Sequence, residues 1–206
     1  MIINGQYVEK LEFHSISEAW FLGDGIFETL RTYENRPFGI SLHLERLENG
    51  AAQKLLPKPD LAALQSGVEK LLLAKPLPSG RLRIIFNSNG EWLISHDPYQ
   101  APENGARCAF FNIPGGEREI AKSTSYGERF AIRRRVTALG LEEAILLNSK
   151  EEVVEGATSN LIASIKGEWV TPTLESGCLP GVTRRLLLDH FGVREGVISK
   201  AELLAC

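Results

Sequence analysis

The sequence has few cysteines, no long hydrophobic run and no large excess of charge of one sign. Three of its 206 residues are cysteine, and Cys108, Cys178 and Cys206 are too few and too scattered for a disulfide framework or a zinc site. No apolar stretch approaches the ~20 residues of a membrane-spanning helix, and the N-terminus does not have the pattern of a signal peptide. These absences favour a protein of the reducing cytoplasm that has no membrane partner and binds no metal.

The charge balance argues against a nucleic-acid partner. The chain has 23 Lys and Arg against 26 Asp and Glu, whereas a surface that binds phosphate backbones needs clustered cations. Its one basic cluster, Arg133 to Arg135, lies in a predicted helix, and we interpret it as a solvated face. With 43% hydrophobic residues, the chain has the composition of a globular protein with one large or two small domains.

The N-terminal part has the pattern of hairpins followed by helices. Asn4-Gly5 and Asn89-Gly90 are typical of tight turns between strands, and Asp60 can cap a helix. Apolar residues at helical spacing predict the helices, and β-compatible runs predict the strands. Strands are expected over residues 1–3, 7–8, 25–33, 38–40, 81–86, 91–94 and 106–111, and helices over 42–55 and 61–72.

Beyond residue 113 the pattern changes. Ile113-Pro114-Gly115-Gly116 predicts a linker, because proline and adjacent glycines favour irregular backbone. The strands and helices that follow have no regular βαβ rhythm, so we predict an α+β or α/β fold of two domains, residues 1–113 and 114–206. Helices are expected over residues 124–139 and 182–190, and strands over 144–147, 161–165 and 169–171.

Lys122 is a candidate nucleophile. A lysine amine reacts with a carbonyl cofactor that is held against it, although most lysines are only solvated surface charges. Ser123 to Ser125 provide small polar residues after it, and Tyr126 follows one predicted helical turn later on the same face. The phenol could hydrogen-bond a cofactor ring oxygen; alternatively, Tyr126 is a half-buried helix aromatic.

Glu155 is a candidate partner for a pyridine nitrogen. It ends a predicted strand and precedes a run of small residues that leads to Asn160, so a flat ring could approach closely. Pyridoxal chemistry uses a carboxylate at the ring nitrogen to keep the ring an electron acceptor. The alternative is a hairpin turn with a surface glutamate.

Leu179 to Thr183 and Arg46 are candidates for binding a phosphate. Pro180-Gly181 precedes a predicted helix, and the free N–H groups and the dipole at a helix N-terminus attract anions. Arg46 could supply a fixed positive charge, although an exposed helix cation is the commoner fate of such an arginine.

Five segments together resemble the successive motifs of the class IV aminotransferase family. They occur in family order and span nearly the whole chain. The segments are GDGIFETLR (residues 23–31), HLERL (43–47), KSTSY (122–126), EGATSNL (155–161) and GCLPGVTR (177–184).

This resemblance implies a fold type IV enzyme with pyridoxal 5′-phosphate as cofactor. It implies a smaller N-terminal α/β domain, a larger C-terminal pseudo-barrel domain that is incomplete at its C-terminus, and a homodimer. Lys122 would bind the cofactor covalently, Tyr126 would face the ring oxygen and Glu155 the ring nitrogen. The other residues implied to bind the cofactor are Arg46, Asn160, Leu179, Val182 and Thr183.

The family contains aminodeoxychorismate lyases, D-amino-acid aminotransferases and branched-chain aminotransferases. The FETLR motif, with Thr29 and Arg31 as candidate substrate residues, looks more like the first two, and the compact N-terminal half favours the lyase. The resemblance thus implies conversion of 4-amino-4-deoxychorismate to 4-aminobenzoate and pyruvate, a step of folate synthesis. A transaminase acting on D-amino acids or branched-chain amino acids is the alternative, and a non-catalytic member is the second.

Overall fold

The computed structural model of the protein describes residues 1–9, 17–113 and 121–206. The chain divides into two compact units. The first contains residues 1–101 and 121–125, and the second contains residues 102–120 and 126–206. Each has its own hydrophobic core, one in the first unit and two clusters in the second.

The first unit contains a six-stranded antiparallel sheet in the order β2-β1-β6-β5-β3-β4. Its longest strands, β3 and β5, pair along their full length, from Gly25 opposite Asn87 to Tyr33 opposite Ser79. The strands are β1 (Ile2–Ile3), β2 (Gln6–Tyr7), β3 (Gly25–Tyr33), β4 (Arg36–Pro37), β5 (Ser79–Asn87) and β6 (Trp92–Pro98).

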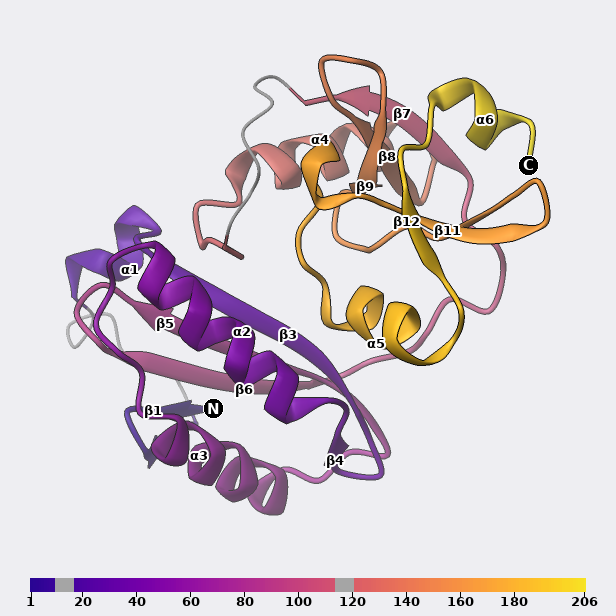
Figure 1. Ribbon diagram of the computed structural model, residues 1–206. Helices are drawn as coiled ribbons and strands as arrows, with labels where there is room; N and C mark the ends of the chain where they lie inside the picture. The colour runs from indigo at the N-terminus through magenta and orange to yellow at the C-terminus, as the bar shows by residue number, and fades with distance from the viewer. Residues whose placement is uncertain (10–16, 114–120) are drawn as a thin grey trace. The chain divides into compact units, whose positions relative to one another are not determined.

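Two long helices lie against this sheet, α2 (Ile40–Gln53) on β3 and α3 (Leu61–Ala74) on β6, and a short helix α1 (Glu18–Leu22) precedes β3 (Figure 1). Residues of β3 alternate between the two sheet faces, so Ile26 and Leu30 join the core while Phe27 and Thr29 point the other way. As predicted, Asp60 caps α3, accepting a hydrogen bond from the Ala63 amide at 3.0 Å.

The second unit contains two three-stranded sheets, β7-β8-β9 and β10-β11-β12. In each sheet one pair is parallel, β7 with β8 and β11 with β12, and a helix lies between the two strands in the chain. The strands are β7 (Cys108–Asn112), β8 (Glu143–Leu147), β9 (Val153–Gly156), β10 (Ala163–Ile165), β11 (Glu168–Pro172) and β12 (Arg194–Gly196). The helices are α4 (Gly127–Ala138), a 3₁₀ helix (Leu174–Ser176), α5 (Val182–His190) and α6 (Lys200–Leu204).

Turn dipeptides locate the hairpins as the sequence predicts. Asn4 and Gly5 have φ of 44° and 83°, and Lys166 and Gly167 have φ of 52° and 84°, the left-handed backbone that a type I′ turn requires. Gly140 follows α4 with φ of 70°, the left-handed backbone that glycine often adopts after a helix C-terminus. Helix α5 has the predicted bounds.

The predicted start of the helix at Thr124 is wrong. Helix α4 begins at Gly127, and the Thr124 amide donates instead to the Gly25 carbonyl of β3 at 2.9 Å. Residues 122–125 therefore lie along the start of β3, and Tyr126 is the residue just before the helix. Lys122 and Tyr126 do not share a helix face, because the backbone hydrogen bonds of this segment go to a strand that is distant in the sequence.

The division of the chain differs from the predicted boundary at residue 113. Strand β7 pairs with β8, which groups it with the C-terminal residues, and residues 121–125 return to the first unit. Of the predicted linker, Ile113 precedes the gap, and Pro114, Gly115 and Gly116 lie outside the described residues.

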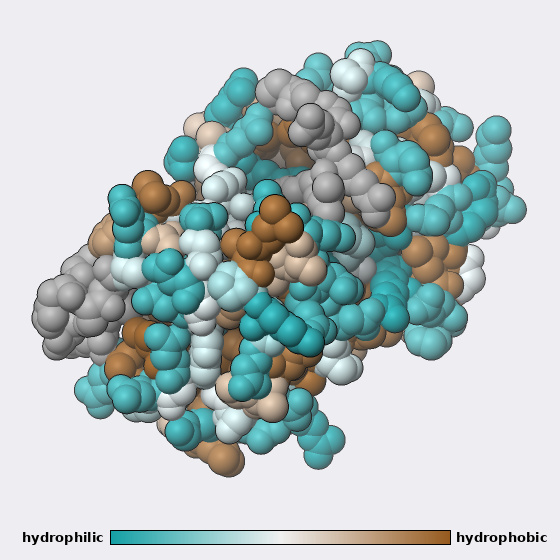
Figure 2. Space-filling model, turned by 60° about the vertical axis from the view of Figure 1, so that its left-hand side comes forward, coloured by the Kyte–Doolittle hydropathy of each residue, from teal (hydrophilic) through white to brown (hydrophobic). Residues whose placement is uncertain are grey.

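On the face drawn in Figure 2, hydrophobic residues form small patches among hydrophilic residues. Within residues 1–9, 17–113 and 121–206, every helix is too short or too polar to cross a membrane. The exposed hydrophobic side chains include neighbouring Phe21 and Leu22 of α1, which are 63% and 68% exposed.

Candidate active site

The backbone of the first unit fixes the position of Lys122. Its carbonyl accepts a hydrogen bond from the Phe27 amide at 2.8 Å, and the next residue, Ser123, forms a bridge with Ile26. The preceding residue, Ala121, is buried in the core, where its Cβ would lie 3.3 Å from a Cβ added at Gly50 of α2. A larger residue than glycine at position 50 would therefore press on the segment that carries the lysine.

The side chain of Lys122 lies beside an aromatic ring. Its amine nitrogen is 4.7 Å from the ring centre of Phe27, within the range of a cation–π contact. The ring belongs to the strand residue that also binds the Lys122 carbonyl, so one residue holds both the backbone and the amine of Lys122. The structure thus places the candidate nucleophile on a segment that is held by contacts with β3.

Arg46 of α2 forms a two-point ion pair with Glu28 of β3. Arg46 Nε and Nη2 donate to the two carboxylate oxygens at 2.8 and 2.6 Å, and His43 Nδ1 lies 2.6 Å from Glu28 Oε2. The Glu28 side chain is 1% exposed and that of Arg46 is 15% exposed. Arg46 is therefore a fixed, partly buried cation rather than a solvated helix residue.

Glu28 carries its negative charge inside the first unit. Burial by itself would raise the pKa of Glu28, but hydrogen bonds from His43 and Arg46 and their positive charge outweigh burial and hold this pKa below its ordinary value. The bond pattern is the bidentate geometry in which arginine pairs with carboxylates most strongly. A guanidinium has five N–H donors in a planar fork, so arginine as a residue type can pair with more than one anion.

The opposite face of the sheet has buried donors with no hydrogen bond. Among the described residues, Thr29 Oγ1, Arg31 Nε and Arg83 Nε are buried atoms that have no hydrogen-bond partner. Thr29 lies directly opposite Arg83 in the β3–β5 register. Burial and the nearby charge of Arg81 lower the pKa of Arg83, so an anion at this face would relieve an unfavourable charge.

The second unit holds Glu155 at the end of β9. Its carboxylate is buried, and its two oxygens have different partners: Arg129 Nη2 of α4 lies 2.7 Å from Oε1, and the Leu179 amide donates to Oε2 at 3.3 Å. The structure therefore brings two predicted residues, Glu155 and Leu179, into direct contact. Glu155 is a buried, paired carboxylate and not the surface glutamate of a hairpin turn.

Tyr126 is connected to the same group. The Tyr126 ring is 7% exposed, and the Arg129 guanidinium carbon lies 5.4 Å from its centre. Phe130 packs edge-on against Tyr126, with ring centres 5.8 Å apart. Arg129 thus touches both Tyr126 and Glu155, the residues predicted to face the ring oxygen and the ring nitrogen.

Asn160 lies against the start of α5. A Cβ added at Gly181, the residue before this helix, would overlap the Asn160 side chain, so a larger residue there would displace Asn160. The N-cap residue of α5 is Gly181, which has no side chain to cap the first turn at Val182 and Thr183. The amides of this nine-residue helix can therefore bind a phosphate, as expected of a helix N-terminus.

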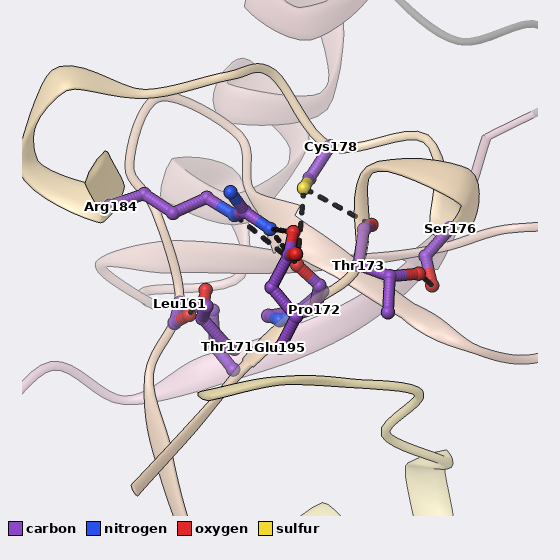
Figure 3. Close-up of polar contacts among 8 residues, drawn as sticks. All are labelled: Leu161, Thr171, Pro172, Thr173, Ser176, Cys178, Arg184 and Glu195. Atoms are coloured by element: carbon purple, nitrogen blue, oxygen red, sulfur yellow. Dashed lines mark hydrogen bonds and ion pairs between the residues drawn. The ribbon is translucent and has the colours of Figure 1, made fainter. Parts of the chain in front are cut away.

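Arg184 anchors this first turn from within the unit. Its Nη2 and Nε donate to the Pro172 carbonyl at the end of β11, at 2.9 and 3.3 Å, and its guanidinium pairs with Glu195 of β12 (Figure 3). Cys178 donates to the Pro172 and Thr173 carbonyls beside it. Burial raises the pKa of Cys178 to about 11, so this thiol is a packed structural group rather than a nucleophile.

Each unit supplies groups of the kind that pyridoxal phosphate needs: the first has an amine on a segment held by backbone hydrogen bonds, and the second has a buried carboxylate beside small residues and a helix N-terminus. A comparison with protein families agrees. The family model described as amino-transferase class IV matches residues 25–206. The chain belongs to this family. It has the fold type IV of pyridoxal-phosphate-dependent class IV enzymes.

Individual relatives have different activities. The aminodeoxychorismate lyase of Bacillus subtilis is 27% identical over 91% of this chain and 72% of its own length. The bifunctional aminodeoxychorismate lyase and D-amino acid transaminase of Mycobacterium tuberculosis is 26% identical over 85% of this chain and 71% of its own length. The structure of a Thermoproteus uzoniensis branched-chain aminotransferase superposes with a TM-score of 0.86, at 25% identity, over 99% of this chain and 80% of that protein.

Four residues that contact or neighbour the candidate site residues were not predicted from the sequence. Glu28 occupies an inward position between Ile26 and Leu30 of a strand, and Arg129 occupies the apolar stripe of a helix three residues before Ile132. A charge on a buried face needs a partner, and this was the available signal. The four missed residues are Glu28, His43, Arg83 and Arg129.

We expect Glu28→Gln to lower the free energy of unfolding at neutral pH. We also expect this free energy to change less with pH in the variant than in the wild type. The folded-state pKa of Glu28 is lowered, so the stability that its charge contributes is complete above the unfolded-state pKa and is lost as pH falls through the folded-state pKa. Breaking a buried pair costs about 3–5 kcal/mol.

Urea unfolding from about pH 7 to about pH 3 measures this difference between variant and wild type. Glu48→Gln is the matched control, because Glu48 pairs with the exposed Lys58 and such surface pairs contribute only about 0–1 kcal/mol. Equal loss of stability in the Glu28 and Glu48 variants would contradict the assignment.

Proposed function

We propose that the chain binds pyridoxal 5′-phosphate. When bound, the cofactor supplies an electron sink for bonds broken next to the substrate nitrogen. Lys122 would hold its aldehyde carbon, Glu155 its ring nitrogen and Tyr126 its ring oxygen. The residues proposed to complete its binding are Arg46, Asn160, Leu179, Val182 and Thr183.

Two kinds of group are proposed to bind the phosphate, one in each unit. Arg46 offers a charge that Glu28 already orients, and the Val182 and Thr183 amides offer donors at a helix N-terminus. Leu179 would pack on the ring, and its amide already binds Glu155. Each of these groups is held in position by contacts within its own unit.

We further propose that the reaction is the cleavage of 4-amino-4-deoxychorismate to 4-aminobenzoate and pyruvate. The observation that carries this proposal is the set of buried donors without hydrogen bonds at Thr29, Arg31 and Arg83 among the described residues. The lyase substrate has two carboxylates, whereas the amino donors leucine and D-alanine have one each and only the acceptor of the transaminase reaction, 2-oxoglutarate, has two. Several cationic donors on one sheet face suit the dianion better.

In this reaction Lys122 would act as base and then as acid. It would accept the ring proton of the bound substrate, the carbon–oxygen bond to the enolpyruvyl group would break, and the departing enolpyruvate would take up a proton to become pyruvate. The ring becomes aromatic, which drives the reaction forward. A homodimer is the proposed assembly, and the folate pathway the proposed place of the reaction.

A transaminase is the second candidate. The relatives support it directly, since one of them is a bifunctional lyase and D-amino acid transaminase, and a structural neighbour is a branched-chain aminotransferase. Lys122 and Glu155 would serve either reaction, so the choice depends on how the substrate carboxylates are bound.

We expect Arg46→Ala to weaken binding of pyridoxal 5′-phosphate by about 10- to 100-fold, the effect of losing a charge-assisted hydrogen bond. Pyridoxal, which lacks the phosphate, is the matched control ligand, and its affinity should change much less. Fluorescence titration with both ligands measures the difference. An equal loss for both ligands would show that Arg46 acts only through the fold.

The lyase assignment predicts turnover of aminodeoxychorismate with no keto acid present. The matched reaction offers D-alanine or L-leucine with 2-oxoglutarate, and we expect it to be slower. Release of 4-aminobenzoate and formation of glutamate are measured in parallel. Efficient glutamate formation with no 4-aminobenzoate would overturn the lyase assignment in favour of the transaminase.

An Arg83→Met variant locates the carboxylate site. We expect its KM for aminodeoxychorismate to rise by about 10-fold or more, since a hydrogen bond between charged groups contributes about 1.5–3 kcal/mol. An unchanged KM in this variant would remove the observation on which the lyase proposal depends.

A further inference from the structure

Arg129 is a buried cation on the apolar side of α4. It is 8% exposed and lies on the same helix as the buried Ile132 and Val136. Its Nη2 lies 2.7 Å from Glu155 Oε1, and its Nη1 donates to the Gly156 and Ala157 carbonyls at 3.5 and 3.4 Å. A buried arginine with these partners is tied to one short stretch of chain, residues 155–157.

We propose that Arg129 is a positioning residue that orients and keeps ionised the carboxylate of Glu155, so that this carboxylate recognises the ring nitrogen of the cofactor. The inference rests on the proposed binding of pyridoxal 5′-phosphate and extends it to a residue that acts through Glu155. It assigns to α4 a direct part in tuning the cofactor.

The orientation follows from the two donors that hold Glu155. Arg129 holds Oε1 and the Leu179 amide holds Oε2, so the carboxylate cannot rotate without losing one of them. An ionised carboxylate has about four acceptor positions. A carboxylate that is held at both oxygens can also accept the N–H of a pyridine ring.

Because the Glu155 carboxylate is buried, it needs a cationic partner to stay ionised. Glu155 is 4% exposed, and an isolated buried carboxylate takes up a proton rather than stay charged. A protonated Glu155 would present no negative charge to the ring nitrogen. The guanidinium of Arg129 remains charged in proteins and so supplies the permanent partner that the ionised form needs.

Arg129 also connects the two ends of the proposed ring site. The same guanidinium lies 5.4 Å from the centre of the Tyr126 ring, three residues earlier in the chain. A shift of α4 would therefore move both the residue proposed for the ring oxygen and the partner of the residue proposed for the ring nitrogen.

The test compares two cofactors that differ at one atom. 1-Deazapyridoxal 5′-phosphate has a carbon in place of the ring nitrogen and keeps the phosphate and aldehyde. We expect wild-type protein to prefer pyridoxal 5′-phosphate over this analogue by about 10-fold or more, and Arg129→Met to lose most of that preference. Arg129→Lys keeps the charge and should restore part of it.

The double variant Arg129→Met/Glu155→Gln removes both buried charges and leaves no unpaired one, so it tests the inference even if Arg129→Met fails to fold. It should bind the two cofactors alike.

Unchanged preference for pyridoxal 5′-phosphate in Arg129→Met or in the double variant would overturn the inference. Loss of affinity for both cofactors to the same extent in Arg129→Met, with no rescue by Arg129→Lys, would mean that Arg129 only supports the fold. Failure of the wild type to bind pyridoxal 5′-phosphate would instead overturn the proposed function and this inference with it.

Discussion

The pairing of residues 121–125 with the start of β3 is the constraint on which the site depends. Two backbone hydrogen bonds, Phe27 to Lys122 and Thr124 to Gly25, fix a short segment that belongs to no helix or long strand of its own. The buried Ala121 beside Gly50 adds packing to these bonds. A lysine can react reliably with a bound group only if its backbone is held in place. Here it is held by β3, which lies almost 100 residues earlier in the chain.

Each unit uses one buried carboxylate to organise its candidate residues. Glu28 holds Arg46 and contacts His43, and Glu155 is held by Arg129 and a backbone amide. Burying paired charges contributes little net stability, because desolvation offsets much of the attraction. What such pairs provide is fixed geometry, and the proposed binding of a charged cofactor needs this geometry more than it needs stability.

Local signals predicted the parts of the fold that local physics decides. The start of α5 follows from Pro180-Gly181, and the hairpin at Asn4-Gly5 follows from an Asn-Gly turn. The start of α4 was not predictable in this way, because the polar residues before it resemble a helix cap while their hydrogen bonds go to β3. The ion pairs of Glu28 and Arg129 join residues that are separated in the sequence. The only sequence signal for them is a charged residue on a predicted buried face.

Titration of the purified protein with pyridoxal 5′-phosphate, followed by borohydride reduction and peptide mapping, tests the central claim most directly. The account predicts near-ultraviolet or visible absorbance of the bound cofactor and a reduced adduct at Lys122. The Lys122→Ala variant should bind the cofactor reversibly and give no adduct. An adduct at a different lysine, or no uptake by the wild type, would contradict the account.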